Sequence, residues 1–200
     1  IYQAFFGQGE WNREKLCDII TGYNALDADK IQPNYFSDNF GGKFFEKSEA
    51  KRIGYIRQDI ENRRDALTEK EYSILLATLI YNIDKIANTL GHFEAFIQKP
   101  IAHKPLYLKL IDAKSIPGIQ IYREDANHLA RHIHSDLVYI DPPYNSRQYS
   151  RFYHVYETLV KWDYPELFGV AMKPAPENMS DYCSNRAGAA MLDLVQHLDC

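Results

Sequence analysis

The chain has little cysteine, no long apolar run and no excess of positive charge. Its three cysteines among 200 residues form no Cys-x-x-Cys pair, which argues against a disulfide framework and a zinc ribbon. No apolar stretch approaches the roughly 18 residues that span a membrane, and the first residues lack the basic segment of a signal peptide. A formal charge of −4 excludes a uniformly basic coat for nucleic acid. We therefore expect a cytoplasmic protein with reduced thiols and no membrane partner.

The composition that remains is that of a folded domain with partly hydrated aromatic surfaces. Hydrophobic residues make up 46% of the sequence and charged residues 25%, which excludes a disordered or fibrous chain. There are 15 tyrosines, and tyrosine suits surfaces that are half buried and half hydrated, such as a ligand cleft. His128 and His132 lie one helical turn apart, but no third ligand with zinc spacing accompanies them, so we predict no metal site.

The first half of the sequence has the period of helices. Apolar residues recur at helical spacing over residues 12–23 and 48–64. Thr68 opens a capping box before a long apolar helix, which Gly91 is placed to end. Residues 1–104 are therefore interpreted as a mainly helical region that includes a candidate lobe for DNA recognition.

The second half changes period. Three apolar runs have the pattern of β-strands: residues 106–111, 118–122 and 136–140. The last of them is a continuous run, typical of a parallel strand that is buried on both faces. Three segments regain helical spacing: residues 127–134, 149–162 and 184–198. This order predicts that residues 105–200 belong to an α/β sheet and form the catalytic part.

An acidic residue and two prolines follow the last apolar run, in the order Asp141-Pro142-Pro143-Tyr144. The prolines impose a rigid, extended turn without backbone donors, and the carboxyl ends of strands in an open α/β sheet face the ligand crevice. The Asp141 carboxylate and the Pro142 carbonyl are both acceptors, so together they can hold the two hydrogens of a planar amine and leave its lone pair free. The Tyr144 ring offers a face on which a base can stack. These four residues are the candidate catalytic set.

Asp-Pro-Pro-Tyr after a hydrophobic strand resembles the signature of N6-adenine DNA methyltransferases. Its continuation through residues 145–160 is similar to the Dam-like alpha group, especially the branch that accompanies type IIS restriction endonucleases. The resemblance implies part of a Rossmann-like sheet with a mainly helical inserted lobe, S-adenosylmethionine (SAM) as methyl donor, and double-stranded DNA as substrate in a restriction–modification system with a cognate endonuclease. It also implies that the target adenine is flipped out of the duplex and that N6 attacks the methyl group directly.

The resemblance assigns a cofactor site as well. The segment that ends in Asp125 and Ala126 is similar to the family's preceding strand and acidic turn, so both residues are expected to contact SAM together with Asp141 and Pro142. Residues 5–9, Phe-Phe-Gly-Gln-Gly, are similar to the family's glycine loop. No strand precedes them, so we do not interpret them as that loop. We expect the true loop upstream of this sequence and a further strand downstream, so the chain is interpreted as part of a longer protein.

Two groups of basic and aromatic residues are candidates for DNA contact. Residues 43–64 hold seven basic and four acidic residues, and within them Arg52 and Arg57 are expected to contact the DNA backbone. The inserted recognition elements of the resembled family occupy a corresponding position. Arg147 and Tyr149 follow the catalytic turn, and we expect them to contact the DNA around the flipped base.

Alternatives stay open on the sequence alone. The site would contact a single extruded base, and an adenine base is the same in DNA and in RNA. Adenine in RNA is therefore an alternative substrate. Methylation of cytosine N4 or of a glutamine amide is disfavoured, because such enzymes usually carry serine or asparagine at the position of Asp141. A third hypothesis is a DNA-binding fragment without catalysis, since the visible cofactor site is incomplete.

Overall fold

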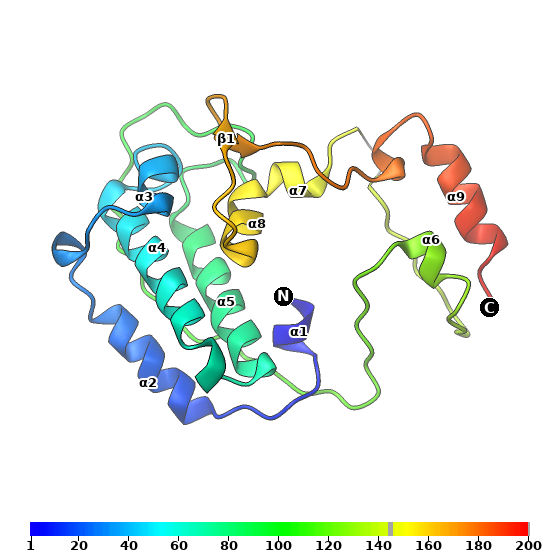
Figure 1. Ribbon diagram of the computed structural model, residues 1–200, viewed down its shortest axis with the longest axis horizontal. Coiled ribbons are helices and arrows are strands. Elements are labelled where there is room, and N and C mark those ends of the chain that lie inside the picture. Colours follow the sequence, from blue (N-terminus) through cyan, green and yellow to red (C-terminus); the bar gives the residue numbers. More distant parts are fainter. Residues whose placement is uncertain (144–145, 200) are drawn as a thin grey trace.

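The computed structural model describes residues 1–143 and 146–199. Its α-helices are α1 (Tyr2–Phe5), α2 (Arg13–Asn24), α3 (Tyr35–Phe40), α4 (Lys47–Asn62), α5 (Glu69–Ile83), α6 (Ala126–Leu129), α7 (Tyr149–Phe152), α8 (His154–Lys161) and α9 (Ala187–Gln196). Short 3-10 helices are η1 (Ala28–Lys30), η2 (Arg64–Ala66), η3 (Asp84–Ile86) and η4 (Asp181–Cys183). Two short strands, β1 (Leu167–Phe168) and β2 (Lys173–Pro174), pair antiparallel. Helices α1–α5 and α8 gather into one body, which we call the helical lobe, and α6 and α9 lie apart from it (Figure 1).

Buried phenylalanines fill the centre of the helical lobe. Five of them are at most 1% exposed: Phe36, Phe40, Phe44, Phe45 and Phe93. Their ring centroids lie 4.9 to 6.3 Å apart in tilted and edge-to-face pairs, which are the favourable arrangements for aromatic rings. Because burying one such side chain contributes about 1.5–3 kcal/mol, this cluster gives the lobe a large hydrophobic driving force.

The capping box at Thr68 is confirmed and also joins two helices. The Thr68 hydroxyl accepts a hydrogen bond from the Glu71 amide at 3.1 Å, and the Glu71 carboxylate accepts one from the Thr68 amide at 3.0 Å. The same carboxylate accepts from the Asn12 amide at 3.0 Å and from the Lys15 amine at 2.6 Å. The start of α5 is therefore tied to the start of α2, and the helices predicted at residues 12–23 and 48–64 are present as α2 and α4.

The prediction that the long helix runs to Gly91 is wrong, because α5 ends at Ile83. After α5 the chain forms the single 3-10 turn η3 and then runs beside the segment between α3 and α4. The side-chain amide of Asn88 donates hydrogen bonds to the carbonyls of Lys43 and Ile97, each at 2.9 Å. These tertiary contacts replace the helical bonds that the local apolar pattern indicated.

The three runs predicted as strands form no strand in the described part of the chain. Around Leu108 the hydrogen bonds go to a helix side chain: Asn24 donates to its carbonyl at 2.9 Å and accepts from its amide at 2.8 Å. In the last run, Leu137 and Tyr139 are 86% and 88% exposed. A strand needs a neighbouring strand for its backbone groups, and the described residues supply none for these runs. The described residues are thus mainly helical with one small sheet, and the Rossmann-like sheet stays a prediction.

The predicted helix over residues 149–162 is divided into α7 and α8. The break falls at Tyr153, whose backbone has φ −113° and ψ 29°, and α8 is closed by Trp162 in the left-handed region at φ 54°. Val155 and Leu159 of α8 are at most 1% exposed and belong to the core of the helical lobe. The segment after the proline turn is therefore anchored in that core.

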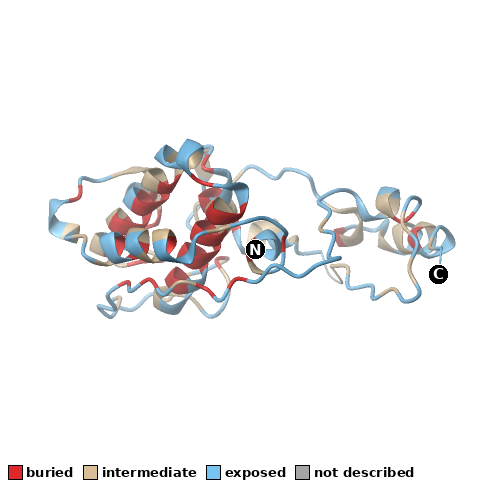
Figure 2. Cartoon of the chain, turned by 90° about the horizontal axis from the view of Figure 1, so that it is seen from below, coloured by how far each residue is buried: buried red, intermediate tan, exposed pale blue. Residues whose placement is uncertain are grey.

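The part of the chain around α6 and α9 is small and mostly exposed (Figure 2). The helices predicted at residues 127–134 and 184–198 are present there as the shorter α6 and α9. Ala130 and Leu194 are among its few buried apolar residues. None of the helices in the described ranges has the length and apolar character needed to cross a bilayer. The division of the chain at residue 104 stays a prediction.

Candidate functional site

A cavity of about 1210 Å³ lies between α6, α9 and the proline turn. Its walls come from four stretches of sequence: residues 124–133, 138–143, 178–182 and 186–198. The volume exceeds the roughly 300–1,000 Å³ of a usual small-molecule site.

The proline turn presents two acceptors at this cavity. Asp141, Pro142 and Pro143 all line it, and Asp141 is exposed. No hydrogen bond from the described residues reaches the Asp141 carboxylate or the Pro142 carbonyl. Both oxygens therefore have no hydrogen-bond donor from the described residues, and the amine contact expected of them stays a prediction. Tyr144 lies outside the described residues.

The acidic turn before α6 lines the same cavity. One carboxylate oxygen of Asp125 accepts a hydrogen bond from the His128 amide at 2.9 Å and so caps α6. Ala126 follows as the first residue of that helix. The structure thus brings Asp125 and Ala126 to the cavity that Asp141 and Pro142 line, although more than a dozen residues separate the two pairs along the sequence.

The cavity is rich in carboxylates. Five acidic residues line it: Glu124, Asp125, Asp141, Asp181 and Asp193. Among the described residues, one cation lines it, Arg186, and its guanidinium is paired with Asp181 at 2.5 Å. Hydrogen bonds from Asn127 and Arg131 lower the pKa of Asp193, which keeps that carboxylate charged. This balance favours a ligand that carries positive charge.

Three polar residues at the back of the cavity were missed by the sequence reasoning. Asn127, Tyr182 and Asp193 come from α6, η4 and α9 and are joined by hydrogen bonds. They lie up to 66 residues apart, and no spacing motif marks them.

The two residues expected to contact DNA beside the turn do not line this cavity. Arg147 forms an ion pair with Glu94 at 3.5 Å, and its side chain is 61% exposed. Tyr149 is the first residue of α7 and is 50% exposed, with its ring 6.5 Å from that of Tyr153. Both are on the surface next to the turn.

The prediction that Arg52 contacts DNA is wrong. Its side chain is buried, with 6% of the residue exposed, and it pairs with Glu49 at 2.9 Å. Its guanidinium also donates to the carbonyls of Leu106 at 3.1 Å and Tyr23 at 3.2 Å. The positive charge of this residue holds the lobe together and does not face solvent.

Arg57 is likewise buried, with 1% exposed, so the DNA contact predicted for it is also wrong. The guanidinium pairs with Glu61 at 2.8 Å and donates to the carbonyls of Leu159 and Val160 at the end of α8. It also lies over the Trp162 ring at 5.1 Å. The helical spacing of the basic residues carried no information on which of them face the core.

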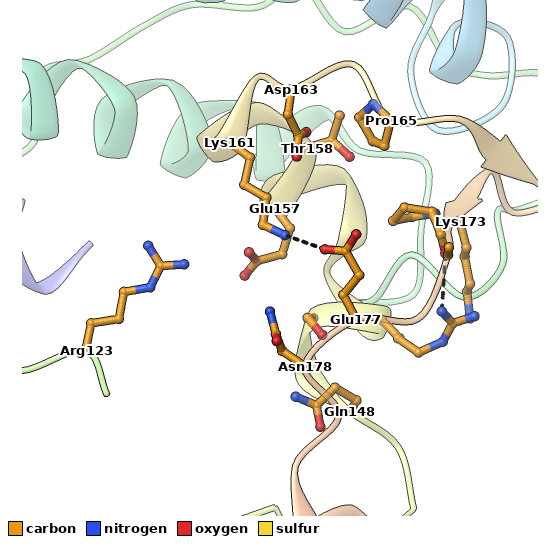
Figure 3. Close-up of a pocket in the computed structure, with 14 residues that line it drawn as sticks. Arg123, Gln148, Glu157, Thr158, Lys161, Asp163, Pro165, Lys173, Glu177 and Asn178 are labelled. Atoms are coloured by element: carbon orange, nitrogen blue, oxygen red, sulfur yellow. Dashed lines mark hydrogen bonds and ion pairs between the residues drawn. The ribbon is translucent and has the colours of Figure 1, made fainter. Parts of the chain in front are cut away.

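A second cavity, of about 260 Å³, lies beside α8 (Figure 3). Its charges are mixed: Lys161 pairs with Glu177 at 3.6 Å, and Arg123 extends toward it without an ion pair in the described part of the chain. Asn178 lines both cavities. The polar surface beside α8 therefore adjoins the acid-lined cavity.

The glycine-containing segment at residues 5–9 has a different role in the structure. It follows helix α1 and not a strand, and it does not line the large cavity. The buried Lys70 amine donates hydrogen bonds to the carbonyls of Gln3 at 3.0 Å, Gly7 at 2.7 Å and Lys114 at 2.8 Å. Burial lowers the pKa of Lys70. The segment is thus a packed turn, in keeping with the interpretation that it is not the cofactor loop.

Two acceptors without donors among the described residues thus lie at an acid-lined cavity. Residues 2–187 match the family of D12 class N6 adenine-specific DNA methyltransferases, and the chain belongs to this family. It is 34% identical over 160 residues to the type II methyltransferase M.FokI of Planomicrobium okeanokoites, covering 76% of this chain and 25% of that protein. It is 37% identical over 157 residues to the modification methylase StsI of Streptococcus sanguinis, covering 75% and 24%.

The chain is also 39% identical over 127 residues to the type II methyltransferase M.NlaIII of Neisseria lactamica, which covers 60% of this chain and 38% of that protein. The chain spans about a quarter of the length of the first two relatives. No solved structure matches it.

Proposed function

We propose that the protein carrying this chain transfers a methyl group from SAM to N6 of an adenine in double-stranded DNA. The observation that carries the proposal is the shared cavity: Asp125 and Ala126 line it together with Asp141 and Pro142. Membership of an adenine-specific DNA methyltransferase family supports the same reaction. Adenine in RNA would present the same amino group, but no comparison favours it.

The cavity suits the cofactor in charge and in size. SAM, when bound, supplies a methyl group on a positively charged sulfur. Asp125 and Ala126 would hold it at the start of α6, where one Asp125 oxygen is fixed by the His128 amide and the other has no partner among the described residues. The surrounding carboxylates complement its positive charge.

Asp141 and Pro142 would orient the adenine amino group. Each oxygen would accept one N–H, so the nitrogen lone pair would be free to attack, and the Asp141 carboxylate would stabilise the positive charge that develops on N6. As the N6–methyl bond forms, the sulfur–methyl bond would break, S-adenosylhomocysteine would leave, and N6 would lose one proton to solvent. No covalent intermediate with the protein is needed, because the nucleophile belongs to the substrate. The base has to leave the duplex to reach this turn, and we propose that the ring of Tyr144 stacks on it.

We propose further that the run at residues 136–140 is a strand of a Rossmann-like sheet in the whole protein. The support is its continuous apolar character together with the exposure of Leu137 and Tyr139. Burial of these side chains between sheet neighbours would recover the hydrophobic free energy that the described residues leave unused. Residues 105–200 would then form the catalytic part, and residues 1–104 the mainly helical region that includes the elements for DNA recognition.

Arg147 and Tyr149 are proposed to contact DNA beside the turn. Both are exposed and both follow the turn directly, so they are placed to meet the strand around an extruded base. Several relatives are named modification methylases. We accordingly propose a role in a restriction–modification system with a cognate endonuclease, acting in the cytoplasm where bacterial DNA lies.

Transfer of tritiated methyl from SAM to oligonucleotides tests the proposal. In the intact protein we expect incorporation into duplex DNA and not into RNA of the same sequence. Asp141→Ala should reduce incorporation at saturating SAM by about 100-fold or more, because it removes a preorganised acceptor at the developing charge. The matched control is Asp136→Ala, at an exposed acid that does not line the cavity. Undiminished incorporation by Asp141→Ala would overturn the assignment, and preferential labelling of RNA would favour the RNA substrate.

A further inference from the structure

Helices α6 and α9 are joined by one side chain that uses all of its hydrogen-bonding groups. The Asn127 amide nitrogen donates to the Asp193 carboxylate at 2.7 Å and to the Ala190 carbonyl at 2.8 Å. Its amide oxygen accepts from the Tyr182 hydroxyl at 2.7 Å. An asparagine side chain has two donors and one carbonyl oxygen, so this geometry matches its chemistry completely. We call Asn127, Tyr182 and Asp193 the α6–α9 cluster.

Charged neighbours fix the cluster in this arrangement. The other Asp193 oxygen pairs with Arg131 at 2.6 Å, and the His197 ring lies 3.4 Å from the same carboxylate. Burial raises the pKa of Tyr182, as do the charges of Asp125 and Asp193, so its hydroxyl keeps the proton that it donates. Each hydrogen bond of the cluster therefore has a defined direction.

The cluster lies where it controls the cofactor turn. Asn127 directly follows Asp125 and Ala126, and all three residues line the large cavity. Tyr182 and Asp193 line the same cavity and lie directly beside Asn127, to which both are hydrogen-bonded. The helix that carries Asn127 has only four residues, so it has little rigidity of its own. Its hydrogen bonds to α9 and η4 therefore help to fix the position of the acidic turn.

We propose that Asn127 is a positioning residue for SAM, which fixes Asp125 and Ala126 against α9 through its bonds to Tyr182 and Asp193. The inference rests on the function proposed above and adds to it a residue that touches neither the transferred methyl nor the adenine. Its effect should appear in cofactor binding and leave the chemical step intact.

Two substitutions should disrupt the cluster in different ways. Asn127→Ala removes the hydrogen bonds from this side chain to α9 and leaves the Tyr182 hydroxyl with only the longer bond to the Ala190 carbonyl, at 3.3 Å. Asn127→Asp keeps the shape but places a carboxylate against the Asp193 carboxylate and the Ala190 carbonyl, where a donor is required. For both variants of the intact protein we expect the KM for SAM, and the Kd for S-adenosylhomocysteine measured by calorimetry, to rise about tenfold, equal to about 1.4 kcal/mol. The kcat at saturating SAM and the KM for DNA should change less than about twofold.

A reciprocal exchange provides the sharper test. In Asp193→Asn the amide of Asn127 faces another amide, and binding should weaken. The double variant Asn127→Asp with Asp193→Asn restores one donor opposite one acceptor, so part of the lost SAM affinity should return. His132→Gln is the matched control, because it exchanges an exposed polar side chain just beyond α6. We expect it to leave the KM for SAM unchanged.

The outcomes separate this inference from the proposed function. A wild-type protein that neither incorporates methyl nor binds S-adenosylhomocysteine would refute the function itself. An active wild type whose Asn127 variants keep the KM for SAM would refute the positioning role. Variants that lose active protein, seen as lower kcat and melting temperature with an unchanged KM, would show that the cluster only stabilises the fold, and the positioning role would again be refuted.

Discussion

The helical lobe and the part that carries the large cavity are held together by different forces. In the lobe, phenylalanines from α3, from the turn before α4 and from the segment after η3 are buried within one core, and even charged groups such as Arg57 are enclosed. Around the cavity, apolar residues such as Leu137 and Tyr139 face solvent, and the contact between α6 and α9 is largely polar. The lobe is thus a complete hydrophobic unit, whereas the cavity is assembled from short segments joined by hydrogen bonds.

The difference shows how the site obtains its rigidity. The proline turn is followed by α7 and α8, and α8 is fixed in the lobe by Val155 and Leu159. Arg57 adds hydrogen bonds to the last carbonyls of that helix. The lobe therefore anchors the proline turn from its downstream side, while α9 holds the acidic turn before α6. Substitutions in the two regions should accordingly affect different measurements.

The largest expected effect is in the core of the lobe. Phe44 is fully buried, with its ring 5.2 Å from Phe93 and 5.5 Å from Phe96. Phe44→Ala should lower the free energy of unfolding by about 4 kcal/mol, through lost transfer free energy and the cavity left behind. Leu137→Ala, at an 86% exposed residue, is the comparison and should cost less than about 0.5 kcal/mol in this chain. Urea unfolding followed by circular dichroism measures both, and equal losses would contradict the contrast between the regions.

Removal of the buried Arg57 should have the next largest effect. Arg57→Met keeps much of the side-chain volume but leaves the carbonyls of Leu159 and Val160 without their donor. We expect a loss of about 3 kcal/mol, since buried acceptors would be unsatisfied. Arg63→Met is the control: Arg63 pairs with Asp59, but its side chain is 46% exposed, so the loss should be under about 1 kcal/mol. DNA affinity that falls with Arg57→Met while stability stays unchanged would restore the DNA contact rejected above.

The buried His154 predicts an acid sensitivity of the lobe. Burial lowers its pKa, while hydrogen bonding to the carbonyls of Ala171 and Arg151 acts in the opposite direction. The unfolded chain titrates near the ordinary value of about 6.5, so below that pH it binds a proton that the folded lobe does not. Stability should therefore fall as the pH falls from about 6.5, by at most about 1.4 kcal/mol per pH unit from this group. The urea midpoint of His154→Gln should depend less on pH in that range than the wild-type midpoint, and identical slopes would exclude the assignment.

The smallest effect is expected at the capping box. Thr68→Ala removes the hydroxyl that accepts from the Glu71 amide, and a lost cap of this kind costs about 1 kcal/mol. Thr89→Ala, outside any described helix, should be close to neutral. Thermal melting compares the two variants. A melting temperature for Thr68→Ala equal to that of the wild type would mean that the links from Lys15 and Asn12 to Glu71 hold the start of α5 without the cap.

The parts of the candidate site that are formed by consecutive residues could be predicted from the sequence. The acid and the two prolines at residues 141–143 indicate an amine-binding turn, and the resemblance adds Asp125 and Ala126, which the structure brings to the same cavity. Asn127, Tyr182 and Asp193 could not be found, because each is an ordinary polar residue until the fold places it beside the others.

Basic residues were the main failure of the sequence reasoning. Arg52 and Arg57 occur in a segment with the composition of a nucleic-acid surface, yet both are buried. Both arginines pair with an acidic residue of their own helix, Glu49 or Glu61, and such pairs also occur on exposed helix faces. Only carbonyls from other elements, such as that of Leu106 for Arg52, show that the charge is buried and compensated.

The local sequence was enough to determine where the main helices begin. The Thr68 hydroxyl and the Glu71 amide are three residues apart, so they can form their hydrogen bond wherever the chain adopts a helix. The chemistry of the turn at Asp141 is equally local, because two prolines restrict the backbone wherever they occur. Only the tertiary structure decided where α5 ends, which arginines are enclosed and which residues join α6 to α9. Those outcomes depend on partners far away in the sequence, and the burial and hydrogen bonds that such partners provide exist only once the chain has folded.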